Sequence, residues 1–111
     1  NNNFSIINIW ASWCLPCKAE HPFLIKLKNE TSVKIIGINY KDKNENASKF
    51  LKDLRNPYDK ILKDKDGTIS INLGAYGVPE TFLIKNKKII KKIIGPINDK
   101  KYANLLKKIN E

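Results

Sequence analysis

The sequence is poor in the residues on which several common kinds of site depend. Its 111 residues include two cysteines and one histidine. Two cysteines exclude a scaffold held by several disulfides and a four-thiolate zinc site. One histidine excludes a histidine-rich metal centre and leaves little for a Ser-His-Asp triad. No run approaches the ~18–20 uninterrupted apolar residues of a membrane helix, so we expect a soluble piece.

Arginine is also scarce, although the chain is strongly basic. The net charge is +10, yet Arg55 is the single arginine, and 20 lysines, 14 asparagines and 17 isoleucines make up almost half of the chain. Because these three residues share A/T-rich codons, genome base composition explains their excess. Recognition of bases and phosphates favours the planar fork of arginine. We therefore expect a solvated basic surface and no nucleic-acid partner.

What the chain does contain is enough apolar sequence for one α/β domain over residues 1–111. It is 41% hydrophobic, and single cores commonly organise about 100–200 residues. The segments 4–10 and 33–38 are rich in β-branched residues and predict strands. Between them we expect a helix that Pro22 kinks and that ends before Thr31. This strand–helix–strand spacing predicts two parallel strands.

The rest of the chain continues the alternation of helix and strand. The expected elements are a helix over 44–54, a short extended piece over 58–62, a turn over 64–67, strands over 81–84 and 88–94, and a helix that begins at 98 or 99. The segment 88–94 also fits one helical face, but its brevity and β-branched content favour a strand. The predicted order is β-α-β-α-β-β-α, with a central mixed sheet flanked by helices.

The strongest chemical signal is Cys14-Leu15-Pro16-Cys17 between a strand and a helix. Cys14 would lie at the helix N-terminus, where free N–H groups stabilise an exposed thiolate, and Cys17 would lie one turn later, shielded. Thiol–disulfide exchange requires this pair. The alternatives are a structural disulfide, which so short a loop makes a poor stabiliser, and half a zinc site, for which Glu20 and His21 on one helix are unsuitable ligands.

Longer strings around the two cysteines carry a family resemblance. Residues 10–18 (WASWCLPCK) resemble the thioredoxin-fold active site, Pro22 matches its helix proline, and residues 77–82 (GVPETF) resemble its cis-proline loop. Four further strings resemble the DsbE/CcmG branch: residues 17–22, 37–42, 56–58 (Asn56-Pro57-Tyr58) and 74–84. One departure is Leu15-Pro16: members of the branch often have proline as the first of the two residues between the cysteines, where this chain has leucine.

The resemblance implies a thiol:disulfide oxidoreductase that acts as a periplasmic reductant. Its substrate would be the Cys-x-x-Cys-His disulfide of apocytochrome c, and a transmembrane thiol reductase would supply electrons. No organic cofactor or metal is expected beyond the redox-active Cys14–Cys17 pair, and we expect a monomer. Because the chain begins three residues before its first strand, we expect an export signal or inner-membrane anchor outside it. The alternatives are a general exported reductase and a redox-inert peptide-binding module.

Motif and resemblance together define the expected site. The catalytic residues are Cys14, Cys17 and Glu20, and the substrate-binding residues are Trp13, Val78, Pro79 and Glu80. Glu20 could be an exposed first-turn carboxylate, but the resemblance favours a proton relay for Cys17. Ordinary thioredoxins place a buried aspartate where this chain has Asn8, which cannot titrate.

The remaining expectations concern the rim of the site. Glu80 could face solvent, or it could join Glu20 in an acidic groove by the dithiol, as the resemblance implies. Trp13 is expected to cover the dithiol, while His21 is expected at the surface without a role. A cis Val78–Pro79 bond would turn the Val78 backbone toward the dithiol to pair with an extended substrate.

Overall fold

A computed structural model of the chain describes residues 3–111 and contains one five-stranded sheet with four helices. The elements are β1 (Phe4–Trp10), α1 (Leu15–Glu30), β2 (Lys34–Tyr40), α2 (Asn44–Leu54), β3 (Lys60–Asp64), α3 (Thr68–Leu73), β4 (Glu80–Lys85), β5 (Lys88–Ile94) and α4 (Asp99–Ile109). No helix within residues 3–111 is long and apolar enough to cross a membrane.

The sheet is mixed, with strand order β3-β2-β1-β4-β5. β1 pairs parallel with β2, as the spacing predicted, and antiparallel with β4. The 88–94 segment is a strand, joined to β4 by Asn86 and Lys87, which both have positive φ values typical of a tight hairpin. The expected fold class and mixed sheet are therefore confirmed.

The expected order of elements omitted β3 and α3. The extended piece predicted over 58–62 is a strand over Lys60–Asp64 that pairs parallel with β2 at the edge of the sheet. Six residues of helix follow the predicted turn, because the buried carboxylate of Asp64 accepts hydrogen bonds from the backbone N–H groups of Ile69 and Ser70. The first helix continues through Pro22 to Glu30.

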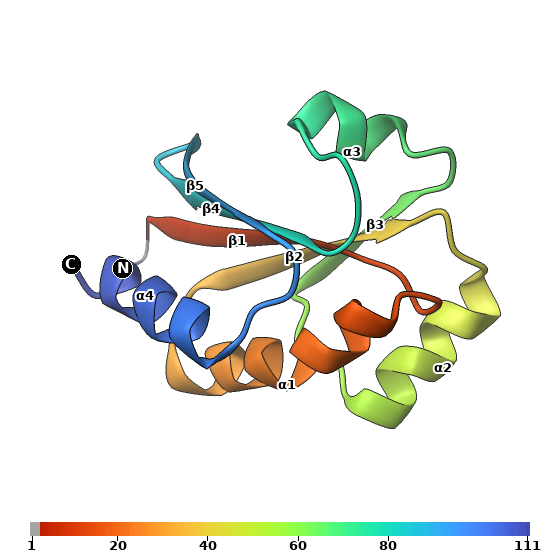
Figure 1. Cartoon of the computed structure of the whole chain (residues 1–111), viewed down its shortest axis with the longest axis horizontal. Coiled ribbons are helices and arrows are strands. Elements are labelled where there is room, and N and C mark those ends of the chain that lie inside the picture. Colours follow the sequence, from red (N-terminus) through yellow and green to blue (C-terminus); the bar gives the residue numbers. More distant parts are fainter. Residues whose placement is uncertain (1–2) are drawn as a thin grey trace.

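Apolar side chains form a core on each side of the sheet. α1, α2 and α4 lie on one side and α3 on the other (Figure 1). Successive residues of β1 point to opposite faces, so Ile6 and Trp10 join the core under α1, whereas Ile9 joins the core on the α3 side. Asn8 shares the face of Ile6 and Trp10. This alternation decides which polar residues of the strands can meet the redox motif.

Candidate active site

The two cysteines form a disulfide at the start of α1. Cys14 is the N-cap of the helix, its Sγ accepts a hydrogen bond from the Cys17 N–H at 3.2 Å, and the two Cα atoms are 5.2 Å apart. Cys17 is buried, as expected. Cys14 was expected to be exposed, but it is only 4% exposed because its sulfur is bonded to Cys17 and packs in the core under α1.

Asp42 anchors the loop before the disulfide. Its Oδ2 accepts hydrogen bonds from Ser12 N at 2.7 Å and Asn39 Nδ2 at 3.0 Å. Its Oδ1 accepts from the Ser12 hydroxyl at 2.7 Å and from Lys43 N at 2.9 Å. Partial burial opposes ionisation, but these hydrogen bonds lower the pKa of Asp42 below its ordinary value. The redox loop is thereby fixed to the β2–α2 connection.

Trp13 lies against the same connection. It is 58% exposed, its Nε1 donates to the carbonyl of Lys41 at 3.0 Å, and its ring is tilted against Tyr40 at 6.4 Å. The indole therefore has fixed partners on the β2–α2 side. That it also limits access to the dithiol stays a prediction.

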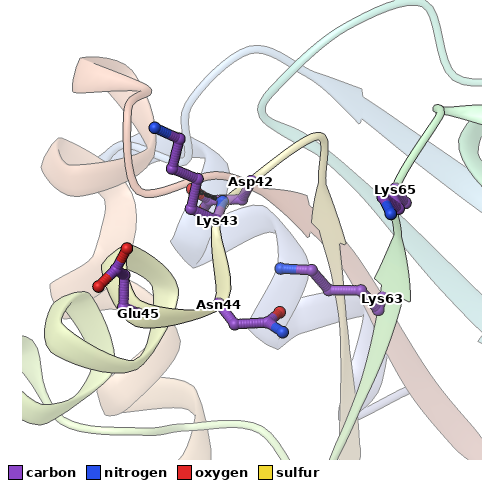
Figure 2. A pocket seen from close by; sticks show the side chains of 6 residues that line it. All are labelled: Asp42, Lys43, Asn44, Glu45, Lys63 and Lys65. Atoms are coloured by element: carbon purple, nitrogen blue, oxygen red, sulfur yellow. Dashed lines mark hydrogen bonds between the residues drawn. The ribbon is translucent and has the colours of Figure 1, made fainter.

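A groove of about 550 Å³ opens beside this anchor. Its lining residues are Asp42, Lys43, Asn44, Glu45, Lys63 and Lys65. In Figure 2, Lys63 extends from β3 toward Asn44 at the start of α2, and its ammonium donates to Asn39 Oδ1 at 2.7 Å. Charges of both signs line this groove, and neither cysteine is among the lining residues, so we do not assign it to the substrate disulfide.

Glu20 lies one turn after Cys17 and is completely buried. Its Oε2 accepts from Asn8 Nδ2 at 2.8 Å and its Oε1 accepts from Ile97 N at 3.1 Å. Burial raises its pKa to about 7, against the lowering effect of these hydrogen bonds and of the Lys101 charge. The exposed alternative considered for Glu20 is thus excluded. A carboxyl group with such a pKa exchanges protons readily near neutral pH.

Asn8 connects Glu20 to two further buried side chains. Its Nδ2 also donates to Thr81 Oγ1 at 3.1 Å, and its Oδ1 accepts from the Tyr58 hydroxyl at 2.8 Å. Asn8 and Thr81 are directly opposite each other in the β1–β4 register, so their side chains share the α1 face. This polar chain crosses the core between the α2–β3 loop, the sheet and α1.

Glu80 does not join Glu20 in an acidic groove. It is opposite Ile9 in the β1–β4 register, so its side chain lies on the α3 face, and it is only 2% exposed. Its Oε2 accepts from the backbone N–H groups of Tyr76 at 2.7 Å and Gly77 at 2.9 Å, and Lys92 Nζ lies 3.2 Å from its Oε1. The expected groove is corrected: sheet alternation separates the two carboxylates, and neither faces solvent.

The loop that Glu80 holds contains the predicted cis bond between Val78 and Pro79. Val78 packs against the cores on both sides of the sheet. The loop lines a pocket of about 250 Å³ together with Ile94 and Gly95. The loop conformation is therefore as expected, whereas pairing of the Val78 backbone with a substrate stays a prediction.

His21 was expected at the surface, but it is buried. It is 2% exposed, its Nε2 lies 2.7 Å from the carbonyl oxygen of Arg55, and its ring meets that of Phe50 edge-on. Burial lowers its pKa, while the hydrogen bond to Arg55 opposes this. His21 thus fastens α1 to the end of α2 and has no partner in the redox motif.

Two residues near the site were not identified from the sequence as functional. Tyr58 was noticed only as part of a resembling string, and Asp42 likewise. The available signals were a polar Asn8 within an otherwise apolar strand and an aspartate directly after β2, at the strand end nearest the motif. Neither signal specifies the residue with which Asn8 or Asp42 forms a hydrogen bond.

Comparison with known proteins places these features in a family context. The model of the Redoxin family matches residues 1–107. The thiol:disulfide interchange protein DsbE of Haemophilus influenzae is 47% identical over 105 residues, which are 94% of this chain and 58% of that protein. DsbE of Pseudomonas aeruginosa is 46% identical over 103 residues, 92% of this chain and 57% of that protein. The chain thus spans a little over half the length of these two relatives.

Among solved structures, the thioredoxin domain of the thiol-disulfide oxidoreductase BVU-2223 from Bacteroides vulgatus superposes with a TM-score of 0.80. The match covers 98% of this chain and 81% of that one, at 22% sequence identity. This likeness shows that the fold is the thioredoxin fold.

Proposed function

Since the chain belongs to the Redoxin family and, within it, to the DsbE group of thiol:disulfide interchange proteins, we propose that it is a thiol:disulfide oxidoreductase that reduces protein disulfides. The observation that carries the proposal is the Cys14–Cys17 disulfide at the N-terminus of α1, one turn from a buried carboxyl group. A structural disulfide does not require that carboxyl group, whereas proton-coupled exchange uses one.

The reaction begins with the reduced dithiol. The Cys14 thiolate attacks one sulfur of the substrate disulfide, a mixed disulfide forms, and the other substrate sulfur leaves as a thiolate. Cys17 loses its proton and attacks the Cys14 sulfur, which forms the Cys14–Cys17 disulfide and expels the second substrate sulfur. Two electrons pass to the substrate, and its two thiolates take up two protons, one that Cys17 has lost and one from solvent. The helix N-terminus stabilises the attacking Cys14 thiolate.

Glu20 is the proposed acceptor of the Cys17 proton. The two residues are three positions apart on α1, which places them on the same face of the helix, and both are buried. A buried thiol has a raised pKa and needs a nearby base to become a nucleophile. With its pKa near 7, Glu20 can take this proton and pass it to the leaving substrate thiolate.

The finer proposal is that the substrate is the Cys-x-x-Cys-His segment of apocytochrome c. It is supported by the DsbE relatives and by the strings over residues 17–22, 37–42 and 74–84. We further propose a periplasmic protein held at the inner membrane by a segment outside this chain, re-reduced by a transmembrane thiol reductase and acting as a monomer. Val78, Pro79 and Trp13 are the proposed substrate contacts. Glu80 supports the Val78–Pro79 loop through the hydrogen bonds that it accepts from Tyr76 N and Gly77 N.

A trapping experiment tests both levels of the proposal. In Cys17→Ser, the mixed disulfide on Cys14 cannot be resolved, so a peptide with an oxidised Cys-x-x-Cys-His segment should accumulate on the protein. The matched peptide ends in alanine instead of histidine. Faster trapping of the histidine peptide supports the cytochrome substrate, and equal rates favour a general exported reductase.

The redox-inert alternative is tested separately with the unmodified chain. Insulin reduction driven by excess dithiothreitol should be accelerated by the protein and not by the Cys14→Ser variant. If the two proteins behave alike, the dithiol has no turnover and the oxidoreductase proposal is wrong.

A further inference from the structure

Among residues 3–111, Tyr58 is the one residue outside the sheet and α1 whose side chain forms a hydrogen bond with the Asn8 side chain. Its hydroxyl donates to Asn8 Oδ1 at 2.8 Å, and the amide nitrogen of Asn8 donates to Glu20 Oε2, also at 2.8 Å. Both bonds are buried. Tyr58 and Glu20 are therefore joined through one amide group, although Tyr58 lies in the loop between α2 and β3.

The path of Tyr58 to Asn8 depends on a glycine. Gly37 is the β2 residue opposite Asn8 in the parallel register, and a Cβ atom there would lie 2.7 Å from Tyr58 Cδ1 and 2.8 Å from Trp10 Nε1. Such contacts are shorter than real Cβ atoms show, so the gap left by Gly37 accommodates the tyrosine ring. The ring is further held by stacking on Trp10 at 5.4 Å. Tyr58 is thus fixed over β2 with its hydroxyl aimed at Asn8.

Chemistry fixes the direction of the hydrogen bonds. An ionised carboxylate only accepts, so Asn8 must present its NH₂ group to Glu20 and its oxygen to Tyr58. Burial, and then the nearby Glu20 charge, raise the pKa of Tyr58 well above its ordinary value, so the hydroxyl keeps its proton and donates. With the opposite orientation, the Asn8 oxygen would face the Glu20 carboxylate and favour only its protonated form.

We propose that Tyr58 is a positioning residue of the redox site: its hydroxyl holds the Asn8 amide with the NH₂ group toward Glu20 and so keeps a donor on the ionised carboxylate. The inference deepens the proposed function, on which it rests for the role of Glu20 as proton acceptor of Cys17. A hydrogen bond to the charged form of an acid lowers its proton affinity. Tyr58 would therefore help to match the proton affinity of Glu20 to neutral pH.

The other groups around Glu20 come from several elements. The Ile97 N–H donates to its second oxygen from the β5–α4 connection, and the charge of Lys101 on α4 also favours the carboxylate. Cys17 on its own helix does not titrate while it is in the disulfide. In the oxidised protein, the Asn8 amide is thus the contact on Glu20 that a change at Tyr58 alters.

The test measures the Glu20 pKa directly in the oxidised protein, by the pH dependence of its side-chain ¹³C carboxyl signal. The signal is assigned by its loss in Glu20→Gln. In Tyr58→Phe, the Asn8 oxygen loses its donor, and the amide is held only through its nitrogen, by Glu20 and Thr81. The Glu20 pKa should then rise by about one unit, a tenfold change in proton affinity. Tyr102→Phe is the matched control: it removes a hydroxyl that donates to Glu30 at 2.8 Å and should leave the Glu20 pKa unchanged.

A double-variant cycle shows whether Tyr58 acts through Asn8. In the isosteric Asn8→Leu background, Tyr58→Phe should move the Glu20 pKa by less than about a third of its effect in the unmodified chain. An unchanged Glu20 pKa in Tyr58→Phe, or a full shift in the Asn8→Leu background, overturns the inference. If the double variant does not fold, the Glu20 pKa in Tyr58→Phe alone still decides whether Tyr58 affects Glu20.

The readout also separates this inference from the proposed function. A raised Glu20 pKa in oxidised Tyr58→Phe, with an unchanged pH dependence of insulin reduction, supports positioning by Tyr58 and contradicts the role of Glu20 as proton acceptor. If both the pKa and the pH–rate profile move to higher pH by the same amount, both are supported.

Discussion

Glu20 and Glu80 lie on opposite faces of the sheet, and both are buried. Glu20 accepts from Asn8 under α1, whereas Glu80 is opposite Ile9 on the α3 side. Lys92 lies 3.2 Å from Glu80, and Glu20 has no comparable ion pair among residues 3–111. The two carboxylates therefore have different physical roles, and substitution at the two positions should change the pH dependence of stability differently.

Glu20→Gln should remove a pH dependence from the stability of the oxidised protein. The Glu20 pKa is about 7 in the folded state against 4.5 for the free side chain, so folding takes up a proton between these values. The contribution of this group is fully present below pH ~4.5 and is lost as pH rises through ~7, a loss of about 3 kcal/mol at most. Urea unfolding from pH 4 to 9 should show this decline in the unmodified chain and a flatter curve in the variant.

The control for that curve is Glu45→Gln, which removes an exposed carboxylate on α2. It should retain the decline between pH 4.5 and 7. If Glu20→Gln retains it too, Glu20 is not the group responsible. Glu20→Gln should also slow insulin reduction, by about tenfold or more if Glu20 moves a proton.

Glu80→Gln should destabilise the protein at pH 8. The charged side chain accepts from Tyr76 N and Gly77 N and faces Lys92. A neutral amide weakens the two hydrogen bonds and removes the ion pair, although the ammonium keeps its hydrogen bond to the Gly74 carbonyl. A loss of about 1–3 kcal/mol is expected, together with faster amide hydrogen exchange at Tyr76 and Gly77. Asp53→Asn, which breaks the exposed Lys49–Asp53 pair, is the control and should cost less than about 0.5 kcal/mol.

Much of the fold could be predicted because its long elements have clear periodicity. The strand over 4–10 and the helix over 44–54 coincide with β1 and α2, and the Asn86-Lys87 turn joins two strands as expected. The short elements could not be predicted in the same way. α3 has six residues, too few for a helical pattern, and its first turn is fixed by hydrogen bonds that the Asp64 carboxylate accepts from Ile69 N and Ser70 N.

The candidate site was predictable in its residues but not in its geometry. The motif specified Cys14 and Cys17, and the resemblance specified Glu20 and Glu80. Whether two carboxylates converge depends on the register of β1 against β4, and a single sequence does not contain the register. The burial of His21 and the reach of Tyr58 across Gly37 likewise depend on how α2 and its following loop pack on the sheet.

The two thiols of the reduced protein should differ in reactivity. Cys14 caps α1 and faces its free N–H groups, so its apparent pKa should fall below the ordinary value of about 8.5. Iodoacetamide should modify Cys14 in the Cys17→Ser variant faster than it modifies Cys17 in Cys14→Ser, over the range pH 5 to 8. Equal rates near neutral pH would mean that the helix terminus does not stabilise the thiolate.

The last prediction concerns the anchor between Asp42 and Ser12. The Asp42 carboxylate accepts four hydrogen bonds, two of them from Ser12, and an amide in its place retains only one acceptor atom. Asp42→Asn should therefore release the loop that carries Trp13 and the disulfide. Amide exchange at Ser12 should accelerate about tenfold, as loss of roughly 1.4 kcal/mol of local protection would produce.

The acid side of the pH curve gives an independent measurement of the same anchor. Because its hydrogen bonds hold the pKa of Asp42 below the ordinary value of 3.8, its contribution to stability is present above that value and is lost as pH falls through the folded-state pKa. Ser12 exchange, corrected for its intrinsic pH dependence, should accelerate on acidification in the unmodified chain and not in Asp42→Asn. The control is Asp66→Asn, which alters an exposed carboxylate that accepts a hydrogen bond from Thr68 N. It should leave Ser12 protected at all pH values. Equal Ser12 protection in the Asp42 and Asp66 variants would show that the β2–α2 connection does not hold the redox loop.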